Sequence, residues 1–142
     1  MKDHRPESLL LAAQALAQTG ELQEALEELK RLESQSIGGR VGSEIRLNLG
    51  LIHEELENFE KASEWFSAVR DDKTDFFNDE ALFHLAIAHE ELGQLDQARE
   101  YLDELEDFID DDAELREAVE RARNRLSRQN EELSEQLRQY DF

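Results

Sequence analysis

The sequence predicts an all-α protein, a right-handed superhelix (solenoid) of three helical hairpins followed by a long C-terminal helix. The first observation is a repeat, because the stretches 43–69 and 79–105 carry the same residue types in the same order. Both contain His-Glu-Glu-Leu, and Ala62 lies 36 residues before Ala98. The second observation is that apolar residues recur at helical spacing within each stretch. Such self-similarity is typical of stacked helical hairpins, none of which buries its apolar stripe alone.

A weaker copy of the same pattern lies upstream, where Ala25 precedes Ala62 by 37 residues. We therefore expect three repeats, at about 6–34, 43–71 and 78–108, each made of two helices. The expected helices span 6–18, 22–34, 43–56, 59–70, 78–91 and 94–108.

A longer helix is expected at about 112–140, capping the exposed face of the last repeat. Its apolar residues recur at intervals of four and three: Leu115, Val119, Ala122 and Leu126. The aspartates at 110–112 would complement the positive end of its dipole. The stripe then breaks and resumes at Leu133, Leu137 and Tyr140. The distal half is either a short pairing helix or, as we favour, a frayed solvated tail, because fewer than two heptads make a weak coiled coil.

The segment 34–43, SQSIGGRVGS, holds three glycines and three serines and is the one stretch of flexible composition. A domain boundary is one interpretation. Because the repeat resumes in phase directly afterwards, we expect instead an elongated loop between repeats. The chain of 142 residues is then a single domain spanning 1–142.

The repeating residues resemble those of the tetratricopeptide repeat (TPR) family over roughly 6–108. In that family a bulky-then-small pair lets the hairpin close, a glycine separates the helices, and an alanine packs in the second helix. The matching residues are Leu49-Gly50, Leu85-Ala86, Gly20, Gly93, Ala25, Ala62 and Ala98. The chain departs from the family at four positions, where polar residues replace the glycine or a large apolar residue: Glu57, Arg46, His53 and His89. Its repeats also exceed the usual length of 34 residues.

The composition is strongly acidic, since 36 Asp and Glu against 16 Lys and Arg give a net charge of −20. Such a surface repels phosphate backbones and anionic lipid, so we expect neither a nucleic acid nor a membrane as partner. The small number of lysines resembles proteins of halophiles, from salt-rich cytoplasm, and a basic partner or compositional drift explains the excess as well. No segment has the apolar length of a signal core or membrane span, so a soluble, cytoplasmic protein is the default expectation.

No pattern indicates catalysis or a cofactor. The chain has no cysteine, no Gly-x-Ser-x-Gly and no glycine-rich phosphate loop. His53 and His89 are each followed by two glutamates, but they hold equivalent repeat positions outside any His-Glu-x-x-His motif, which favours structural histidines over metal ligands. The aspartates at 71–75 and 110–112 lack the spacing of a calcium loop. We expect no enzyme activity, no metal site and no cofactor.

The family resemblance implies a concave surface lined by the first helix of each hairpin. It assigns ten residues of the second and third repeats to partner binding: Glu44, Leu47, Asn48, Leu51, Glu54, Glu80, Phe83, His84, Ile87 and Glu90. The first repeat adds Glu7, Leu10 and Gln14. The first helices of the second and third repeats have a surplus apolar face that needs a cover, which is a bound segment, the C-terminal helix or tighter packing. Family members that bind a C-terminal carboxylate do so with Lys, Arg and Asn, and the glutamates here disfavour such a clamp.

The favoured hypothesis is a non-catalytic protein–protein interaction module that binds an apolar or amphipathic peptide or helix, flanked by Lys or Arg, in the concave groove. The alternative is a structural or self-assembling subunit that pairs through its C-terminal helix or through Trp65 and Tyr101. We expect a monomer or a weak homodimer. Because a fold does not name a function, the partner's identity stays open.

Overall fold

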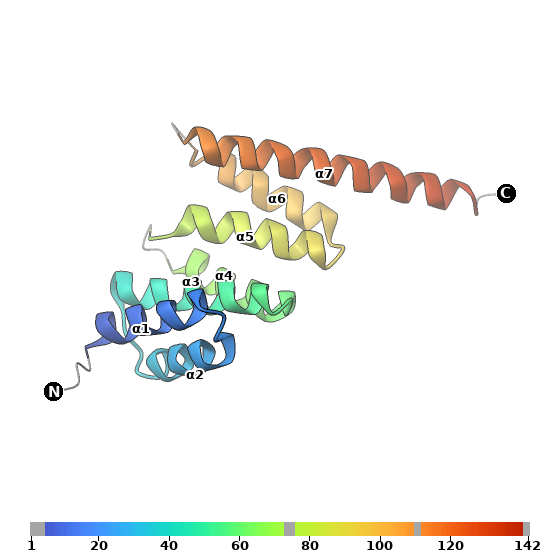
Figure 1. Cartoon of the computed structure of the whole chain (residues 1–142). Helices are drawn as coiled ribbons and strands as arrows, with labels where there is room; N and C mark the ends of the chain where they lie inside the picture. Colours follow the sequence, from blue (N-terminus) through green and yellow to red (C-terminus); the bar gives the residue numbers. More distant parts are fainter. Residues whose placement is uncertain (1–4, 73–75, 110–111, 141–142) are drawn as a thin grey trace.

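The computed structural model describes residues 5–72, 76–109 and 112–140, and in that part of the chain it contains helices and no strand. The helices are α1 (Pro6–Gln18), α2 (Leu22–Glu33), α3 (Gly39–Glu55), α4 (Phe59–Asp71), α5 (Asn78–Glu91), α6 (Leu95–Glu106) and α7 (Ala113–Arg138). They form three antiparallel hairpins, α1–α2, α3–α4 and α5–α6, which stack in order, and α7 packs on the end of the stack (Figure 1). The predicted all-α solenoid is confirmed.

The turn inside each hairpin places one residue in the left-handed backbone region. Gly20 and Gly93 have φ of 87° and 78°, and Glu57 has φ of 59° at the equivalent place in the second hairpin. Glycine adopts this conformation at no steric cost, whereas glutamate does not. The departure from the family pattern at Glu57 therefore changes the residue without changing the turn.

The loop between the first two hairpins is shorter than predicted, because α3 begins at Gly39 rather than at Ser43. A left-handed residue at each end, Ser36 with φ of 54° and Gly39 with φ of 67°, reverses the chain in a few steps. The loop then packs directly on α3. A Cβ at Gly42 would lie 2.0 Å from the carbonyl oxygen of Ile37, so only glycine fits there.

The last helix, α7, is continuous over 26 residues. Asp112 caps its start, since its Oδ1 accepts a hydrogen bond from the backbone N–H of Leu115 at 3.1 Å; the other two aspartates of 110–112 lie outside the described residues. In Figure 1, α7 runs along α6 and continues past the ends of α5 and α6. Residues 130–140 are all exposed, yet the helix persists to Arg138. The distal half is therefore solvated, as predicted, but it is helical as far as Arg138, where fraying was expected.

The apolar core is continuous along the stack because three clusters share helices. The first cluster joins α1, α2 and α3, the second joins α3, α4 and α5, and the third joins α5, α6 and α7. The repeated alanines Ala25, Ala62 and Ala98 are completely buried in them, as the family resemblance implies. Each hairpin thus completes the core of its neighbour, which is why the hairpins stack.

Candidate functional site

The first helices of the hairpins, α1, α3 and α5, lie in one row, and polar contacts join them in series. Gln14 Nε2 donates to Glu44 Oε1 at 3.2 Å, linking α1 to α3. His84 Nδ1 lies 2.9 Å from Glu54 Oε1, linking α5 to α3. At the end of the row the carboxylate of Glu90 accepts hydrogen bonds from α7. The surface that carries these contacts is called the groove face below.

Between α1 and α3 the groove face contains a hollow of about 340 Å³. It is lined by Gln14, Ala17, Gln18, Asn48, Leu51, Ile52 and Glu55. Two of the predicted partner-binding residues, Asn48 and Leu51, are therefore brought together here. The Asn48 side chain is oriented by donating to the backbone oxygen of Glu44 at 2.7 Å. The volume is at the low end of ligand-binding pockets, and the lining is both apolar and polar.

Two leucines assigned to this surface belong to the core instead. Leu47 and Leu10 are each only 4% exposed and pack in the second and first core clusters. The leucine that α1 exposes is Leu11, at 65%. The sequence contained a signal for Leu11 that the prediction missed. Leu11 lies 37 residues before Asn48, so it holds the equivalent position in the first repeat.

The aromatic side chains of α5 on the groove face pack against neighbouring residues. Phe83 is half-buried against the third core cluster, with its ring edge-on to His84 at 5.7 Å. His84 also stacks on the ring of Phe66 at 5.3 Å. Ile87 is half-buried and Glu80 is exposed, so these two of the predicted residues remain accessible.

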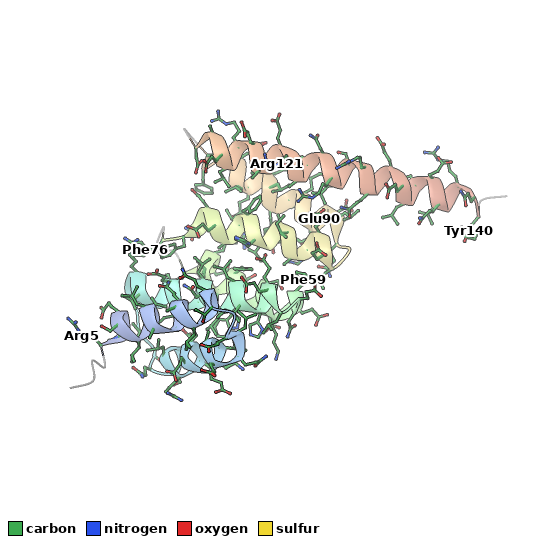
Figure 2. All side chains as sticks on the ribbon, in the orientation of Figure 1. Arg5, Phe59, Phe76, Glu90, Arg121 and Tyr140 are labelled. Carbon is green, nitrogen blue, oxygen red and sulfur yellow. The ribbon has the colours of Figure 1, made fainter. Side chains whose placement is uncertain are left out.

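Glu90 is not accessible as predicted, because α7 covers it. Arg125 donates to its two oxygens from Nε and Nη2 at 3.1 and 3.0 Å, and Gln129 donates to Oε2 at 2.6 Å. The Glu90 side chain is left 10% exposed, and its hydrogen bonds raise the pKa of Arg125. Figure 2 shows Glu90 on the α5 ribbon, close to α7. The C-terminal helix therefore covers the Glu90 end of α5, whereas the hollow between α1 and α3 stays open.

Arg46, which stands where the family has a large apolar residue, joins neighbouring hairpins. Its guanidinium pairs with Glu33 at the end of α2, at 3.5 Å, and with Asp72 after α4, at 3.1 Å. The Arg46 side chain is 17% exposed. A similar contact joins the next hairpins, because Arg70 of α4 pairs with Glu104 of α6 at 3.0 Å.

The aromatic residues considered for self-association pack within the chain. Trp65 packs against the first core cluster. Tyr101 lies under the guanidinium of Arg70, whose Cζ is 5.7 Å from the ring centroid, and its ring is 5.1 Å from that of His89.

The two repeat-equivalent histidines also have structural surroundings. His53 is 3% exposed, and burial lowers its pKa. Its Nδ1 has no hydrogen-bond partner among the described residues, whereas Nδ1 of His89 bonds to Oε1 of Gln94.

No group of three or more His, Cys, Asp or Glu that could hold a metal occurs in the described ranges. None of the helices described combines the length and the apolar character needed to cross a membrane.

Comparison with known proteins matches tetratricopeptide repeat models to residues 10–75 and 80–107. A solved structure from Podospora anserina, the nearly identical TPR-like repeats of a kinesin-light-chain type protein, superposes with a TM-score of 0.70 at 19% identity, over 95% of this chain and 72% of that chain. The assembly chaperone of RpL4 (Acl4) superposes with a TM-score of 0.52 at 22% identity, over 87% of this chain and 51% of that chain. These likenesses show the fold. No curated protein sequence matches the chain.

Proposed function

The chain belongs to the tetratricopeptide repeat family, and we propose that it works as a non-catalytic module that binds a protein partner through its groove face. The bound segment is an apolar or amphipathic peptide or helix with Lys or Arg at its flanks. The three hairpins and α7 act as one domain, since the core runs through all of them. The structural neighbour named as an assembly chaperone of RpL4 likewise acts on another protein.

The observation that carries the proposal is the open hollow between α1 and α3. Leu51 lines it, and Leu11 is exposed on the same face of α1 as Gln14, three residues further along. A partner's apolar side chain that covers such groups gains about 25 cal/mol for each Å² removed from water. Glu55 lines the hollow, and Glu80 is exposed on the neighbouring hairpin in α5; these are the carboxylates that a flanking Lys or Arg would meet.

Binding of labelled peptides, followed by fluorescence anisotropy, tests the proposal. The probe is a helical peptide with one leucine stripe and lysines at both ends, and a matched peptide has serine in place of leucine. Leu51→Asp combined with Ile87→Asp should weaken binding of the leucine peptide by about tenfold or more, because each change removes an apolar contact. The control is Phe108→Asp, which changes a 57% exposed residue outside the groove face.

Equal binding by the groove variant and the wild type would contradict the proposal, as would equal binding of the leucine and serine peptides. Circular dichroism melts of each variant show whether lost binding reflects lost folding. Affinity capture followed by mass spectrometry then identifies natural partners that the groove variant no longer retains.

A separate observation favours self-assembly as a second candidate function. The projecting part of α7 exposes Leu133 at 48% and Leu137 at 69% on one helical face. A second copy would cover this short stripe. Light scattering on the intact chain and on a Leu133→Glu, Leu137→Glu variant tests it, since a monomer in both cases contradicts pairing through α7.

A further inference from the structure

One segment of α7 is strongly basic on an otherwise acidic protein. Residues 121–128, RARNRLSR, contain four of the twelve arginines of the chain and no acidic residue, while the whole chain carries a net charge of −20. The arginine side chains here are Arg121, Arg123, Arg125 and Arg128.

Two of the four arginines fix the orientation of α7 on the stack. Arg123 pairs with Asp103 and Glu106 of α6 at 2.6 and 3.1 Å. Arg125 pairs with Glu90 of α5, at the end of the groove face. The Arg123 side of α7 therefore faces α6, and the Arg125 side faces the groove face.

The other two arginines lie on the side of the groove face. Arg121 is four residues before Arg125 and Arg128 is three residues after it, and residues at these spacings share one helical face. Arg121 is 67% exposed, and its one ion pair among the described residues is with Glu117, at 3.9 Å. Arg128 is exposed and makes no ion pair with any described residue. Figure 2 marks Arg121 on α7.

Together with Asn124, Arg121, Arg125 and Arg128 form one open polar surface on α7. Arg121, Asn124, Arg125 and Arg128 are called the arginine face below. The hydrogen bonds of Arg125 to Glu90 hold one guanidinium in place, so that part of the surface is ordered before any ligand arrives.

We propose that the arginine face binds an acidic segment of the protein partner, one that carries Asp or Glu side chains. The proposal rests on the proposed function, because it extends the groove face past α5. Guanidinium groups bind carboxylates through two parallel hydrogen bonds, a geometry that lysine does not offer. The groove face is then polarised, with Glu55 and Glu80 on α3 and α5 and the arginines on α7. A partner with basic residues at one end and acidic residues at the other binds in a single direction.

The surrounding charge argues against a nucleic acid as the occupant. A phosphate backbone binds by replacing counterions along an extended basic surface. Here the basic segment covers two turns of one helix, and acidic residues outnumber basic ones by 36 to 16 in the whole chain. A short peptide with acidic residues at one end and basic residues at the other is not repelled in this way, because its basic end meets Glu55 and Glu80.

The test uses three labelled peptides with blocked ends and the same leucine stripe. One carries lysines at both ends, and the other two carry lysines at one end and glutamates at the other, in the two possible orders. Binding to the full chain is measured by anisotropy at physiological ionic strength. The variant is Arg121→Gln combined with Arg128→Gln. Its control, Arg31→Gln combined with Arg138→Gln, removes the same charge from residues whose side chains are 68% and 72% exposed and lie outside the arginine face.

We expect the Arg121, Arg128 variant to weaken binding of the better-bound glutamate peptide by about tenfold, and to leave binding of the lysine peptide unchanged or slightly stronger, since the arginines repel lysine. The control variant should change neither by more than about twofold. A glutamate peptide that binds the Arg121, Arg128 variant as well as it binds the wild type would overturn the inference. In that case the proposed function would still stand if the Leu51, Ile87 variant no longer bound any of the peptides. If the Leu51, Ile87 variant bound every peptide normally, the proposed function itself would fail.

Two further outcomes would overturn the acidic peptide as occupant. A short DNA duplex that binds at physiological ionic strength, and loses binding with Arg121 and Arg128, would assign the face to nucleic acid. A dimer in light scattering that the same variant dissociates would assign it to a second copy of the chain, whose Glu131, Glu132 and Glu135 supply carboxylates.

Discussion

The ring of Phe66 in α4 lies directly over Gly50 of α3, so close that a Cβ on residue 50 would be 2.5 Å from Cε1 and 2.7 Å from Cδ1 of the ring. Phe66 is completely buried, and it also stacks on His84 of the groove face. The close approach of α3 and α4 therefore depends on a missing side chain, and it supports a residue of the candidate site.

Replacing Gly50 with alanine should destabilise the protein by about 1–3 kcal/mol, because the buried ring has to move to admit one methyl group. This loss opposes the gain of about 1 kcal/mol that alanine brings to a helix interior. Urea denaturation measures the difference. Phe66→Leu makes room for the methyl group, so the cost of Gly50→Ala should be smaller in that background. Additive effects of the two changes would show that the contact does not limit packing.

The burial of His53 should make stability depend on pH. Burial lowers its pKa in the folded state, and the nearby cations Lys61 and Lys30 lower it further. In the unfolded chain a histidine has a pKa of about 6.5. Above that pH both states are neutral and the residue has no effect. As the pH falls through and below about 6.5, the unfolded state binds a proton that the folded state does not, so the free energy of unfolding falls until the lower folded-state pKa is reached.

Urea denaturation of the wild type and of His53→Phe across this pH range measures the effect. The difference in stability between the two proteins should move in favour of His53→Phe as the pH decreases, while the titration of the carboxylates is common to both. A difference that stays constant between about pH 7.5 and 5 would contradict a lowered pKa for His53.

Lengthening Asn58 by one methylene should stabilise the second hairpin. Asn58 precedes α4 with φ −96° and ψ 74°, and Gln94 precedes α6 with φ −92° and ψ 72°. From this position Gln94 reaches Nδ1 of His89, whereas Nδ1 of His53 has no partner among the described residues. We expect Asn58→Gln to supply that hydrogen bond and raise the free energy of unfolding by about 0.5–1.5 kcal/mol. Gln94→Asn should lower the free energy of unfolding. If both variants were as stable as the wild type, the hydrogen bond to the histidine Nδ1 would not contribute to stability.

Added salt should raise the melting temperature, because the charge of −20 opposes a compact fold. Like charges one helical turn apart repel by a few tenths of a kcal/mol per pair. Raising KCl from about 0.1 M to 1 M shortens the Debye length from about 10 Å to about 3 Å, which removes most of this repulsion. Ion pairs such as Arg70–Glu104 lose some strength as well, but acidic residues outnumber basic ones by 36 to 16.

Thermal melts in the two salt concentrations check this expectation. A Glu24→Gln, Glu27→Gln variant, changed at two exposed positions of α2, should melt at a higher temperature in low salt and gain less from KCl. A melting temperature that falls or stays level in 1 M KCl would show that carboxylate repulsion does not limit the fold.

The limits of most helices could be predicted from the residues, because the signals involved are local. The spacing of apolar residues and the turn residues predict helices at 6–18 and 78–91, where α1 and α5 lie. The 36-residue register also predicts that Ala62 and Ala98 are buried alike. The early start of α3 at Gly39 could not be predicted in this way, because it depends on the contact between Ile37 and Gly42.

The candidate site was predicted less completely, because accessibility depends on neighbouring helices. Leu47 and Leu51 are one turn apart in α3, yet the first is in the core and the second lines a hollow. Glu90 lies 35 residues before Arg125, and the two meet only because α7 crosses the end of α5.

The sequence by itself determined the three hairpins, the order in which they stack and the presence of a long last helix. Helical periodicity and turn residues are local signals that span a few residues, so they can be recognised in a single sequence. The tertiary structure alone decided which residues at the edge of each apolar stripe stay exposed, which glutamates remain accessible, and that Arg125 of α7 meets Glu90 of α5. Those outcomes depend on the distance and rotation between helices far apart in the sequence, which the period of a single helix does not specify.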